Sequence, residues 1–354
     1  MKAIVKYGYG KFETEIRDVP VPTIGDDDVL LEVKAAGVCG SDIAFDDGGH
    51  ENLLNPPVIL GHEFSGVVSK IGRNVTEWKV GDRVVSDNTG KVCGKCYACG
   101  VADYLSCPER LGLGYGMDGG FAKYVRIPGE TLKVFPNSLM SIPQELSFEE
   151  AAIIDPCSNA YMAVVQESKF MPGDYGAVFG VGALGQFSIQ ALRAAGAAKI
   201  IAIGLSEDKK ERFDLAKYNG ATDIVVADEV DTIEEVNRLT NGEGVGLVVD
   251  CAGVAVVLKQ SIEIVRTAGE IVKIGYDEKP VGFSLDPLID KAVSLKGHFG
   301  YNWLSWRGVM NLAVAGKIDL KSMISHKMKL SEFRAAFDLV RDRKAIKIVL
   351  YPED

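Results

Sequence analysis

Four of the chain's seven cysteines lie in the stretch GKVCGKCYACGVADYLSCPE, residues 90–109. Cys93, Cys96, Cys99 and Cys107 are spaced C-x₂-C-x₂-C-x₇-C, so their thiolates can surround one metal ion without ligands from elsewhere in the chain. Four thiolates suit tetrahedral Zn²⁺ and leave it no open coordination position, which predicts a structural zinc. An iron–sulfur centre is the alternative use of the same ligands.

A second set of residues predicts metal chemistry of a different kind. Cys39 lies in GVCGSDIAF, His62 and Glu63 lie in VILGHEFSGVV, and Asp155 lies in IIDPCSNAY. One thiolate, one imidazole and carboxylates form a borderline-soft ligand set that suits Zn²⁺. The alternative for His62 is a core histidine whose hydrogen bonds are satisfied. We therefore expect a catalytic zinc site separate from the cysteine cluster.

The stretch YGAVFGVGALGQFSIQALRAAGA predicts a dinucleotide site. Its glycines have G-x-G-x-x-G spacing at the point where a strand ends and an amphipathic helix begins. Glycines so placed allow a tight turn and a close approach of the backbone to a pyrophosphate at the helix N-terminus. The positions expected to contact the cofactor are Gly180, Gly182, Ala183, Leu184, Gly185, Gly204, Ser206 and Lys209.

The choice between NAD and NADP depends on the next strand, KIIAIG, which ends in Gly204. An acidic residue at this strand end normally binds the adenosine ribose. Gly204 leaves room for a 2′-phosphate, which Ser206, Lys209 or Lys210 would bind. Alternatively, Glu207 or Asp208 would reach the ribose if the loop folds back, and both lysines would only cover a solvated helix face. The cofactor is thus NAD or NADP, and Gly204 favours NADP.

The secondary-structure elements that position these residues follow two different patterns along the chain. At 354 residues the chain exceeds what one hydrophobic core usually organises. Residues 1–154 contain short β-type runs separated by turn formers, which predicts a β-rich domain that includes the cysteine lobe, 90–110. Strands alternate with helices over 155–298, which predicts an α/β domain with a doubly wound parallel sheet. The pattern changes again over 299–354.

Composition excludes several classes of protein. A formal net charge of −10 argues against a nucleic-acid partner, which would need a basic face. We find no apolar run long enough to span a membrane and no apolar signal-peptide core at the N-terminus, so a cytoplasmic location is expected. In a reducing compartment, clustered cysteines indicate metal ligands rather than disulfides.

Together, GVCGSD, GHEFSGVV, VGDRV, the cysteine spacing and GVGALG resemble the zinc-dependent medium-chain dehydrogenase/reductase family, across essentially the whole chain. That family includes alcohol, sorbitol, threonine and polyol dehydrogenases. The resemblance implies a GroES-like catalytic domain made from both chain ends, with 299–354 as its C-terminal return. The same resemblance implies a Rossmann dinucleotide-binding domain over 155–298 and an active site in the cleft between the two domains. It also implies a small-molecule alcohol or ketone substrate and a homodimer or homotetramer.

The resemblance also assigns roles to residues. It makes Cys39 and His62 catalytic zinc ligands, and Glu63 either a ligand or a carboxylate behind the ligands. Asp155 falls where sorbitol dehydrogenases have a Glu near the metal and bacterial secondary-alcohol dehydrogenases have an Asp ligand. Ser41 matches the hydroxyl that relays the substrate's proton. The four-cysteine run matches the family's structural zinc lobe.

Two departures from the family pattern bear on the substrate. Ala44 stands where many members have a relay histidine. His50 is a candidate for that role, and the alternative is that His50 is a solvated loop histidine. Gly300 and Tyr301 stand where sorbitol dehydrogenases have an Arg–Tyr pair that holds the polyol. The leading hypothesis is hydride transfer between a secondary alcohol, polyol or sugar-alcohol type, and NAD(P). The aromatic residues of 299–306 keep open a bulky apolar or ring alcohol such as a steroid hydroxyl. A non-catalytic dinucleotide-binding protein is the remaining alternative.

Overall fold

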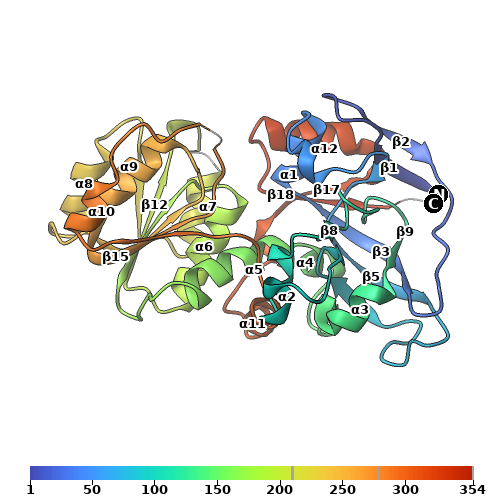
Figure 1. Ribbon diagram of the computed structural model, residues 1–354. Coiled ribbons are helices and arrows are strands. Elements are labelled where there is room, and N and C mark those ends of the chain that lie inside the picture. The colour runs from blue at the N-terminus through green and yellow to red at the C-terminus, as the bar shows by residue number, and fades with distance from the viewer. Residues whose placement is uncertain (209–210, 278, 353–354) are drawn as a thin grey trace. The chain divides into compact units, whose positions relative to one another are not determined.

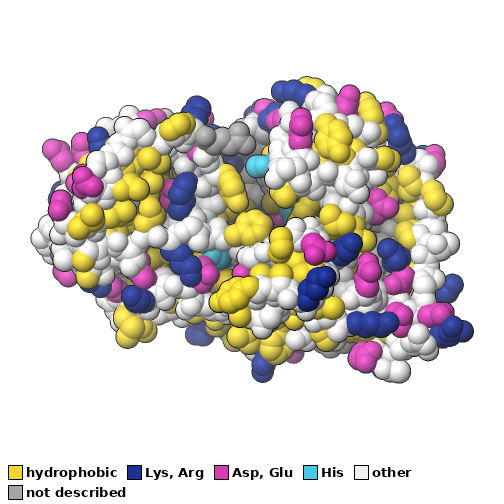
Figure 2. All heavy atoms as spheres, in the orientation of Figure 1, with side chains coloured by type: hydrophobic (Ala, Val, Ile, Leu, Met, Phe, Trp, Pro, Cys, Tyr) yellow, Lys and Arg dark blue, Asp and Glu magenta, His cyan; other side chains and the backbone are white. Residues whose placement is uncertain are grey.

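The computed structural model describes residues 1–208, 211–277 and 279–352 (Figure 1). Two compact units emerge from its contacts. Unit 1 comprises Met1–Asp155, Asn302–Trp306 and Leu320–Asp354, and unit 2 comprises Pro156–Tyr301 and Arg307–Asp319. Within the described residues, no helix has the length and apolar character needed to cross a bilayer. Acidic, basic and apolar side chains are mixed over the face shown in Figure 2.

Unit 1 is built mainly from antiparallel sheets. A seven-stranded sheet has the order β10-β6-β5-β3-β18-β17, with β9 also paired to β3. A three-stranded sheet has the order β2-β1-β4, and β7 pairs with β8 in the cysteine lobe. The strands are β1 Lys2–Lys6, β2 Thr14–Asp18, β3 Val29–Val38, β4 Val58–Ile59, β5 Glu63–Ile71, β6 Arg83–Ser86, β7 Thr89–Lys91, β8 Leu111–Gly112, β9 Tyr124–Ile127, β10 Leu139–Ser141, β17 Ile324–Lys329 and β18 Lys347–Tyr351.

The helices of unit 1 and the hydrophobic core connect the two ends of the chain. They are α1 Gly40–Asp46, α2 Tyr97–Gly100, α3 Gly129–Val134, α4 Phe148–Ala152 and α12 Phe333–Arg341. Strand β18 pairs antiparallel with β3, and its Ile348 and Leu350 join one core with Val33, Phe64 and Phe121. The last strand of the chain is therefore part of the same sheet as the early strands.

Unit 2 is a parallel six-stranded sheet of order β13-β12-β11-β14-β15-β16. Its strands are β11 Tyr175–Phe179, β12 Lys199–Gly204, β13 Asp223–Val226, β14 Val245–Asp250, β15 Val265–Lys273 and β16 Ser294–Gly297. The strand order reverses direction at β11, because β12 and β14 lie on its opposite sides. This is the arrangement of a doubly wound dinucleotide-binding sheet, so the predicted fold class is confirmed.

Helices cover both faces of this sheet. Side chains alternate along β11: Val178 packs with residues of α6 and α7, while Ala177 and Phe179 pack with residues of α8 and α9. The alternation follows from the two-residue period of a strand, and burial on both faces explains why the strands are almost wholly apolar. The helices are α6 Ala183–Ala194, α7 Arg212–Asn219, α8 Thr232–Leu239, α9 Ala255–Ile264 and α10 Asp286–Asp290.

Two further helices cross the unit boundaries. Helix α5 (Ile154–Tyr161) and helix α11 (Trp303–Val314) each begin in unit 1 and continue in unit 2. Residues 307–319 are part of unit 2 in this division. The Gln190 side chain on α6 donates to the Asp319 carbonyl at 3.1 Å and accepts from its amide at 2.7 Å, which ties this segment to unit 2.

Candidate functional site

The structure brings Cys39, His62 and Glu63 together. One ligand atom of each lies within 4.8 Å of the others. Cys39 follows the end of β3 and is the N-cap of α1, while His62 and Glu63 stand at the start of β5. The two strands are antiparallel with Gly37 opposite Glu63, so the end of one lies beside the start of the other. A side chain at position 37 would collide with the Glu63 carboxylate, so this approach requires the glycine.

Asp42 orients two of these residues. Its Oδ2 accepts a hydrogen bond from the Cys39 amide at 2.9 Å, and its Oδ1 lies 3.4 Å from His62 Nδ1. Burial lowers the pKa of His62, but the charges of Asp42 and Cys39 outweigh it and raise that pKa well above its usual value. With Asp42 facing Nδ1, Nε2 is the ring nitrogen left for a metal ion.

Ser41 lies beside the same imidazole. Its Oγ is 3.3 Å from His62 Nε2. The hydroxyl is therefore next to the nitrogen that faces away from Asp42. His50 is further along the chain, where its ring meets the edge of Phe45 with centroids 6.2 Å apart. The structure thus places the Ser41 hydroxyl beside His62.

Lys347 is a residue that sequence reasoning missed. Its Nζ donates to Glu63 Oε1 at 2.7 Å, to Glu63 Oε2 at 2.5 Å and to the Val38 carbonyl at 2.8 Å. Both charged side chains are buried. Burial lowers the pKa of Lys347, but Glu63 and then Cys39 outweigh it and raise that pKa. The only sequence signal was a lysine in the otherwise apolar strand KIVLY.

Asp155 lies outside the group of three. Its Oδ2 accepts from Asn88 Nδ2 at 3.2 Å, and Asn88 Oδ1 accepts a short hydrogen bond from Arg110. The Asp155 carboxylate still helps to raise the pKa of Lys347, so its charge acts on the site.

Arg110 also donates to the Tyr115 hydroxyl at 2.6 Å, and the centroid of the Tyr115 ring lies 5.9 Å from that of His62. Asn88, Arg110 and Tyr115 were not expected from the sequence.

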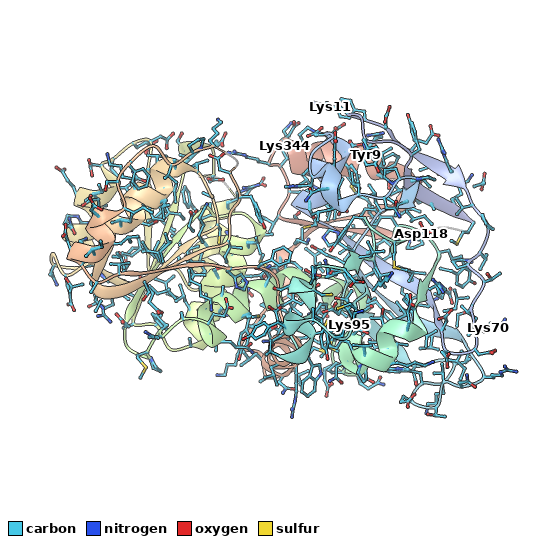
Figure 3. The ribbon with its side chains drawn as sticks, viewed as in Figure 1. Tyr9, Lys11, Lys70, Lys95, Asp118 and Lys344 are labelled. Atoms are coloured by element: carbon cyan, nitrogen blue, oxygen red, sulfur yellow. The ribbon has the colours of Figure 1, made fainter. Side chains whose placement is uncertain are left out.

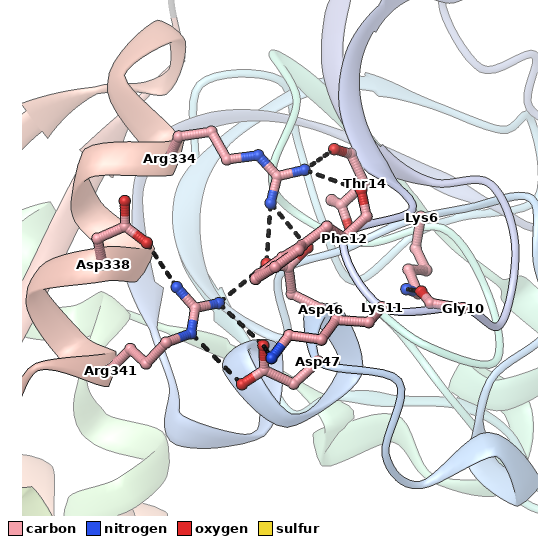
Figure 4. Close-up of polar contacts among 10 residues, drawn as sticks. All are labelled: Lys6, Gly10, Lys11, Phe12, Thr14, Asp46, Asp47, Arg334, Asp338 and Arg341. Atoms are coloured by element: carbon pink, nitrogen blue, oxygen red, sulfur yellow. Dashed lines mark hydrogen bonds and ion pairs between the residues drawn. The ribbon is translucent and has the colours of Figure 1, made fainter.

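Helix α1 is held at its other end by arginines from α12 (Figure 4). Arg334 donates to both oxygens of the fully buried Asp46 at 2.9 and 2.8 Å, and Arg341 donates to the same carboxylate at 3.1 Å. Lys11 and Phe12 approach this cluster from the β1–β2 loop, from which Tyr9 and Lys11 project (Figure 3). Since Asp46 ends the helix that Cys39 caps, these ion pairs help to position Cys39.

The cysteine lobe has the geometry of a closed metal site. The sulfur atoms of Cys93, Cys96, Cys99 and Cys107 all lie within 4.8 Å of one another, and those of Cys93 and Cys99 are 4.0 Å apart. A zinc–sulfur tetrahedron has edges of about 3.8 Å. Backbone amides of Lys95 and Cys96 lower the pKa of Cys93 to about 7. The four sulfur donors, the distances between them and the lowered pKa of Cys93 fit a structural zinc.

The glycine-rich turn of unit 2 fits a pyrophosphate. Gly180 has a φ of 87°, and a side chain at Gly185 would collide with the Gly180 carbonyl. Gly182 is the N-cap of α6, and among the described residues a methyl there would meet Arg212 alone, at 3.9 Å. In this part of the structure the described residues leave the space before the helix N-terminus open to a ligand. Ala183 and Leu184 are the first residues of α6.

The end of β12 does not have the open space for a 2′-phosphate that Gly204 suggested. A Cβ at Gly204 would meet the Phe213 ring at 2.9 Å and Asp208 Oδ2 at 3.0 Å. Ser206 does not present a free hydroxyl, because its amide and Oγ donate to Asp228 at 2.7 and 2.6 Å. Lys209 lies outside the described residues.

The chain matches two family models, "Alcohol dehydrogenase GroES-like domain" over residues 25–137 and "Zinc-binding dehydrogenase" over residues 183–315. It is 41% identical to an uncharacterized zinc-type alcohol dehydrogenase-like protein of Escherichia coli K12, covering 99% of this chain and 98% of that one. It is 35% identical to a sorbitol dehydrogenase of Halalkalibacterium halodurans over the full length of both. It is 34% identical to a D-arabitol-phosphate dehydrogenase of Enterococcus avium, covering 99% and 97%.

Solved structures agree with these matches. The 2R,3R-butanediol dehydrogenase of Bacillus subtilis aligns with a TM-score of 0.89, 31% identity and 99% coverage of both chains. A structure from Sinorhizobium meliloti 1021 that is bound to NADP aligns with a TM-score of 0.89, 28% identity and 99% coverage of both.

Proposed function

Because this chain belongs to the zinc-dependent medium-chain dehydrogenase family, we propose that it transfers hydride between a secondary alcohol of the polyol or sugar-alcohol type and NAD(P). It is a zinc-containing, NAD(P)-dependent oxidoreductase whose relatives are alcohol and polyol dehydrogenases. The observation that carries the proposal is the convergence of Cys39, His62 and Glu63, with Ser41 beside His62.

We propose that Cys39 and His62 Nε2 hold the catalytic zinc, and that Asp42 keeps the proton on His62 Nδ1 so that Nε2 stays available. When bound, zinc polarises the substrate oxygen as a Lewis acid, and the nicotinamide ring exchanges hydride with the substrate carbon. Ser41 Oγ would hydrogen-bond the substrate hydroxyl and pass its proton outward.

Glu63 and Asp155 have different parts in this proposal. Lys347 neutralises Glu63, so Glu63 adds to the donor set without leaving an unpaired buried charge. Asp155 is the remaining candidate ligand, and Asn88 orients its Oδ2. The same assignment gives the four-cysteine lobe a structural zinc, and Gly180, Gly182 and Gly185 the cofactor's pyrophosphate.

The substrate proposal rests on the polar surroundings of the three residues. The chain of hydrogen bonds from Tyr115 through Arg110 and Asn88 to Asp155 offers donors and acceptors suited to a hydroxyl-rich substrate. Named relatives act on sorbitol and D-arabitol phosphate. The aromatic residues of 299–306, on which the alternative of a ring substrate depends, do not share one environment. Tyr301 and Trp306 are buried core residues, whereas Phe299 is 53% exposed.

A homo-oligomer, dimer or tetramer, is the assembly that the sheet edge of unit 2 favours. Strand β16, with the sequence SLKG, is one of the two edge strands, and all four of its residues are exposed, including Leu295. An open edge of a parallel sheet is normally covered, and a second copy would cover it. Sedimentation analysis of the wild type and of Leu295→Glu tests this: a monomeric wild type contradicts it.

The test of function is an assay of nicotinamide reduction with polyols, polyol phosphates, simple secondary alcohols and steroids, using both cofactors. Cys39→Ser should lower turnover by about 10³-fold or more and reduce bound zinc from about two ions to about one per chain. Cys157→Ser, at a buried thiol outside both cysteine sites, is the matched control and should keep both ions. Undiminished turnover in Cys39→Ser would overturn the assignment, and turnover of steroids alone would overturn the polyol proposal.

A further inference from the structure

We infer that Asp208 takes the place of the acidic residue missing from the end of β12 and makes this protein bind NAD in preference to NADP. The inference rests on the proposed dinucleotide site at the glycine-rich turn. It reverses the preference that Gly204 suggests when the sequence is considered alone.

The turn after β12 carries the carboxylate back to the strand end. Residues Ser206–Asp208 form one 3₁₀ turn, and Asp208 Oδ2 accepts from the Leu205 amide at 3.0 Å. The same oxygen lies 3.0 Å from the position that a Cβ on Gly204 would occupy. A carboxylate belonging to residue 204 would place its oxygens about 2.4 Å from that Cβ by ordinary bond geometry. The Asp208 carboxylate therefore lies close to the position that an acidic side chain at residue 204 would occupy.

Arg212 connects this carboxylate to the glycine-rich turn. Its NH1 lies 3.4 Å from Asp208 Oδ1 and 3.9 Å from the Cβ position of Gly182. Strands β11 and β12 are parallel neighbours with Phe179 opposite Ile203, so the two turns that follow them are adjacent. Asp208 and Arg212 thus border the path between the pyrophosphate turn and the end of β12, where the adenosine ribose lies in this type of sheet.

The charges around the strand end disfavour a 2′-phosphate. Arg212 is balanced by Asp208, and both side chains are largely buried. Ser206 is occupied by Asp228, which adds a second carboxylate at the same turn. The carboxylates of Asp208 and Asp228 thus lie at this turn, and a 2′-phosphate placed beside Asp208 would meet negative charge. Lys209 and Lys210, which follow Asp208 in the chain, lie outside the described residues. The two hydroxyls of an unmodified ribose can instead donate to a carboxylate.

The opposite outcome would have Arg212 bind the 2′-phosphate. That requires the guanidinium to exchange its buried carboxylate partner for the cofactor. The wild-type affinities separate the two possibilities, because a 2′-phosphate bound by Arg212 would make NADP bind at least as tightly as NAD. Asp208→Asn removes the repulsion and frees Arg212, whereas Arg212→Met leaves the acidic charge unbalanced.

The experiment is calorimetric titration of the zinc-loaded enzyme with NAD and NADP, and with AMP and adenosine 2′,5′-bisphosphate as probes of the adenosine half alone. The wild type should bind NAD at least about tenfold more tightly than NADP. Asp208→Asn should reduce that ratio about tenfold, chiefly by strengthening NADP binding. Arg212→Met should weaken NADP further. The control is Asp214→Asn, which removes an exposed acid from α7, the helix that contains Arg212. It should leave the ratio of NAD to NADP affinity unchanged.

Each result bears on the inference in one direction. Equal or tighter binding of NADP by the wild type overturns it, even if the variants fail to fold. An unchanged ratio in folded Asp208→Asn, or an equal shift in Asp214→Asn, also overturns it. Failure of the wild type to bind either dinucleotide would instead refute the proposed cofactor site itself.

Discussion

Replacing Lys347 with methionine should destabilise unit 1 severely. The substitution keeps an unbranched apolar stem but removes the ammonium group that donates to both oxygens of Glu63 and to the Val38 carbonyl. Glu63 is 1% exposed and Lys347 is 2% exposed, so water cannot replace the lost donor without opening the sheet. The variant therefore leaves a buried carboxylate without its cation.

The magnitude follows from that isolated charge. Removing one partner of a buried ion pair lowers the free energy of unfolding by about 3–5 kcal/mol. The lost hydrogen bond to Val38 overlaps with this loss and is not added separately. In the zinc-loaded protein we expect the lower end of the range, because a metal ion at Cys39 and His62 supplies positive charge close to Glu63.

The assay is urea unfolding followed by tryptophan fluorescence. All three tryptophans, Trp78, Trp303 and Trp306, belong to unit 1, so their signal reports on that unit. Lys327→Met is the matched control, because Lys327 is an exposed lysine of the adjacent strand β17 that pairs with Glu149 at 2.8 Å. Its loss should be no more than about 1 kcal/mol.

The combination Glu63→Gln/Lys347→Met completes the design. Because it removes both charges, it should be less destabilised than the sum of its two single variants. A loss below about 1 kcal/mol for Lys347→Met, no greater than that of Lys327→Met, would refute the reasoning. Strict additivity of the two single variants would show that the contact between Glu63 and Lys347 contributes nothing.

Two further predictions concern ionisation. Among the four cysteines of the lobe in zinc-free protein, iodoacetamide should modify Cys93 before Cys99, because amide donors lower the pKa of Cys93 to about 7 while burial raises that of Cys99 to about 12. Mass spectrometry should show that zinc loading protects the lobe, and equal rates of modification with and without zinc would contradict a metal there. Burial raises the pKa of Glu149, but Lys327 and Tyr351 outweigh it and lower that pKa to about 2. A carboxylate whose pKa is lowered by folding stabilises the fold at pH values above its ordinary pKa near 4.5, and this stabilisation is lost as the pH falls toward 2. The difference in free energy of unfolding between wild type and Glu149→Gln should therefore shrink as the pH falls from 5 to 3. A constant difference would refute this.

The sequence by itself identifies those parts of the molecule whose residues are close together in the chain. The four cysteines span fifteen positions, 93–107, and the glycine-rich turn spans six, 180–185, so local spacing already carries their chemistry. Alternation of strands and helices likewise predicts the doubly wound sheet, because burial on both faces demands apolar strands. Cys39 and His62 could be proposed as partners because each stands in a short motif.

Only the tertiary structure decides which distant charges meet. Lys347 is 284 positions from Glu63, and Arg334 is 288 positions from Asp46; strand register and helix packing, not spacing, bring these pairs together. The position of Asp155 outside the group of three, and the return of Asp208 to the end of β12, depend on backbone turns that no motif encodes. A buried charge must find its counter-charge wherever the fold places it, so its partner is determined in space rather than along the chain.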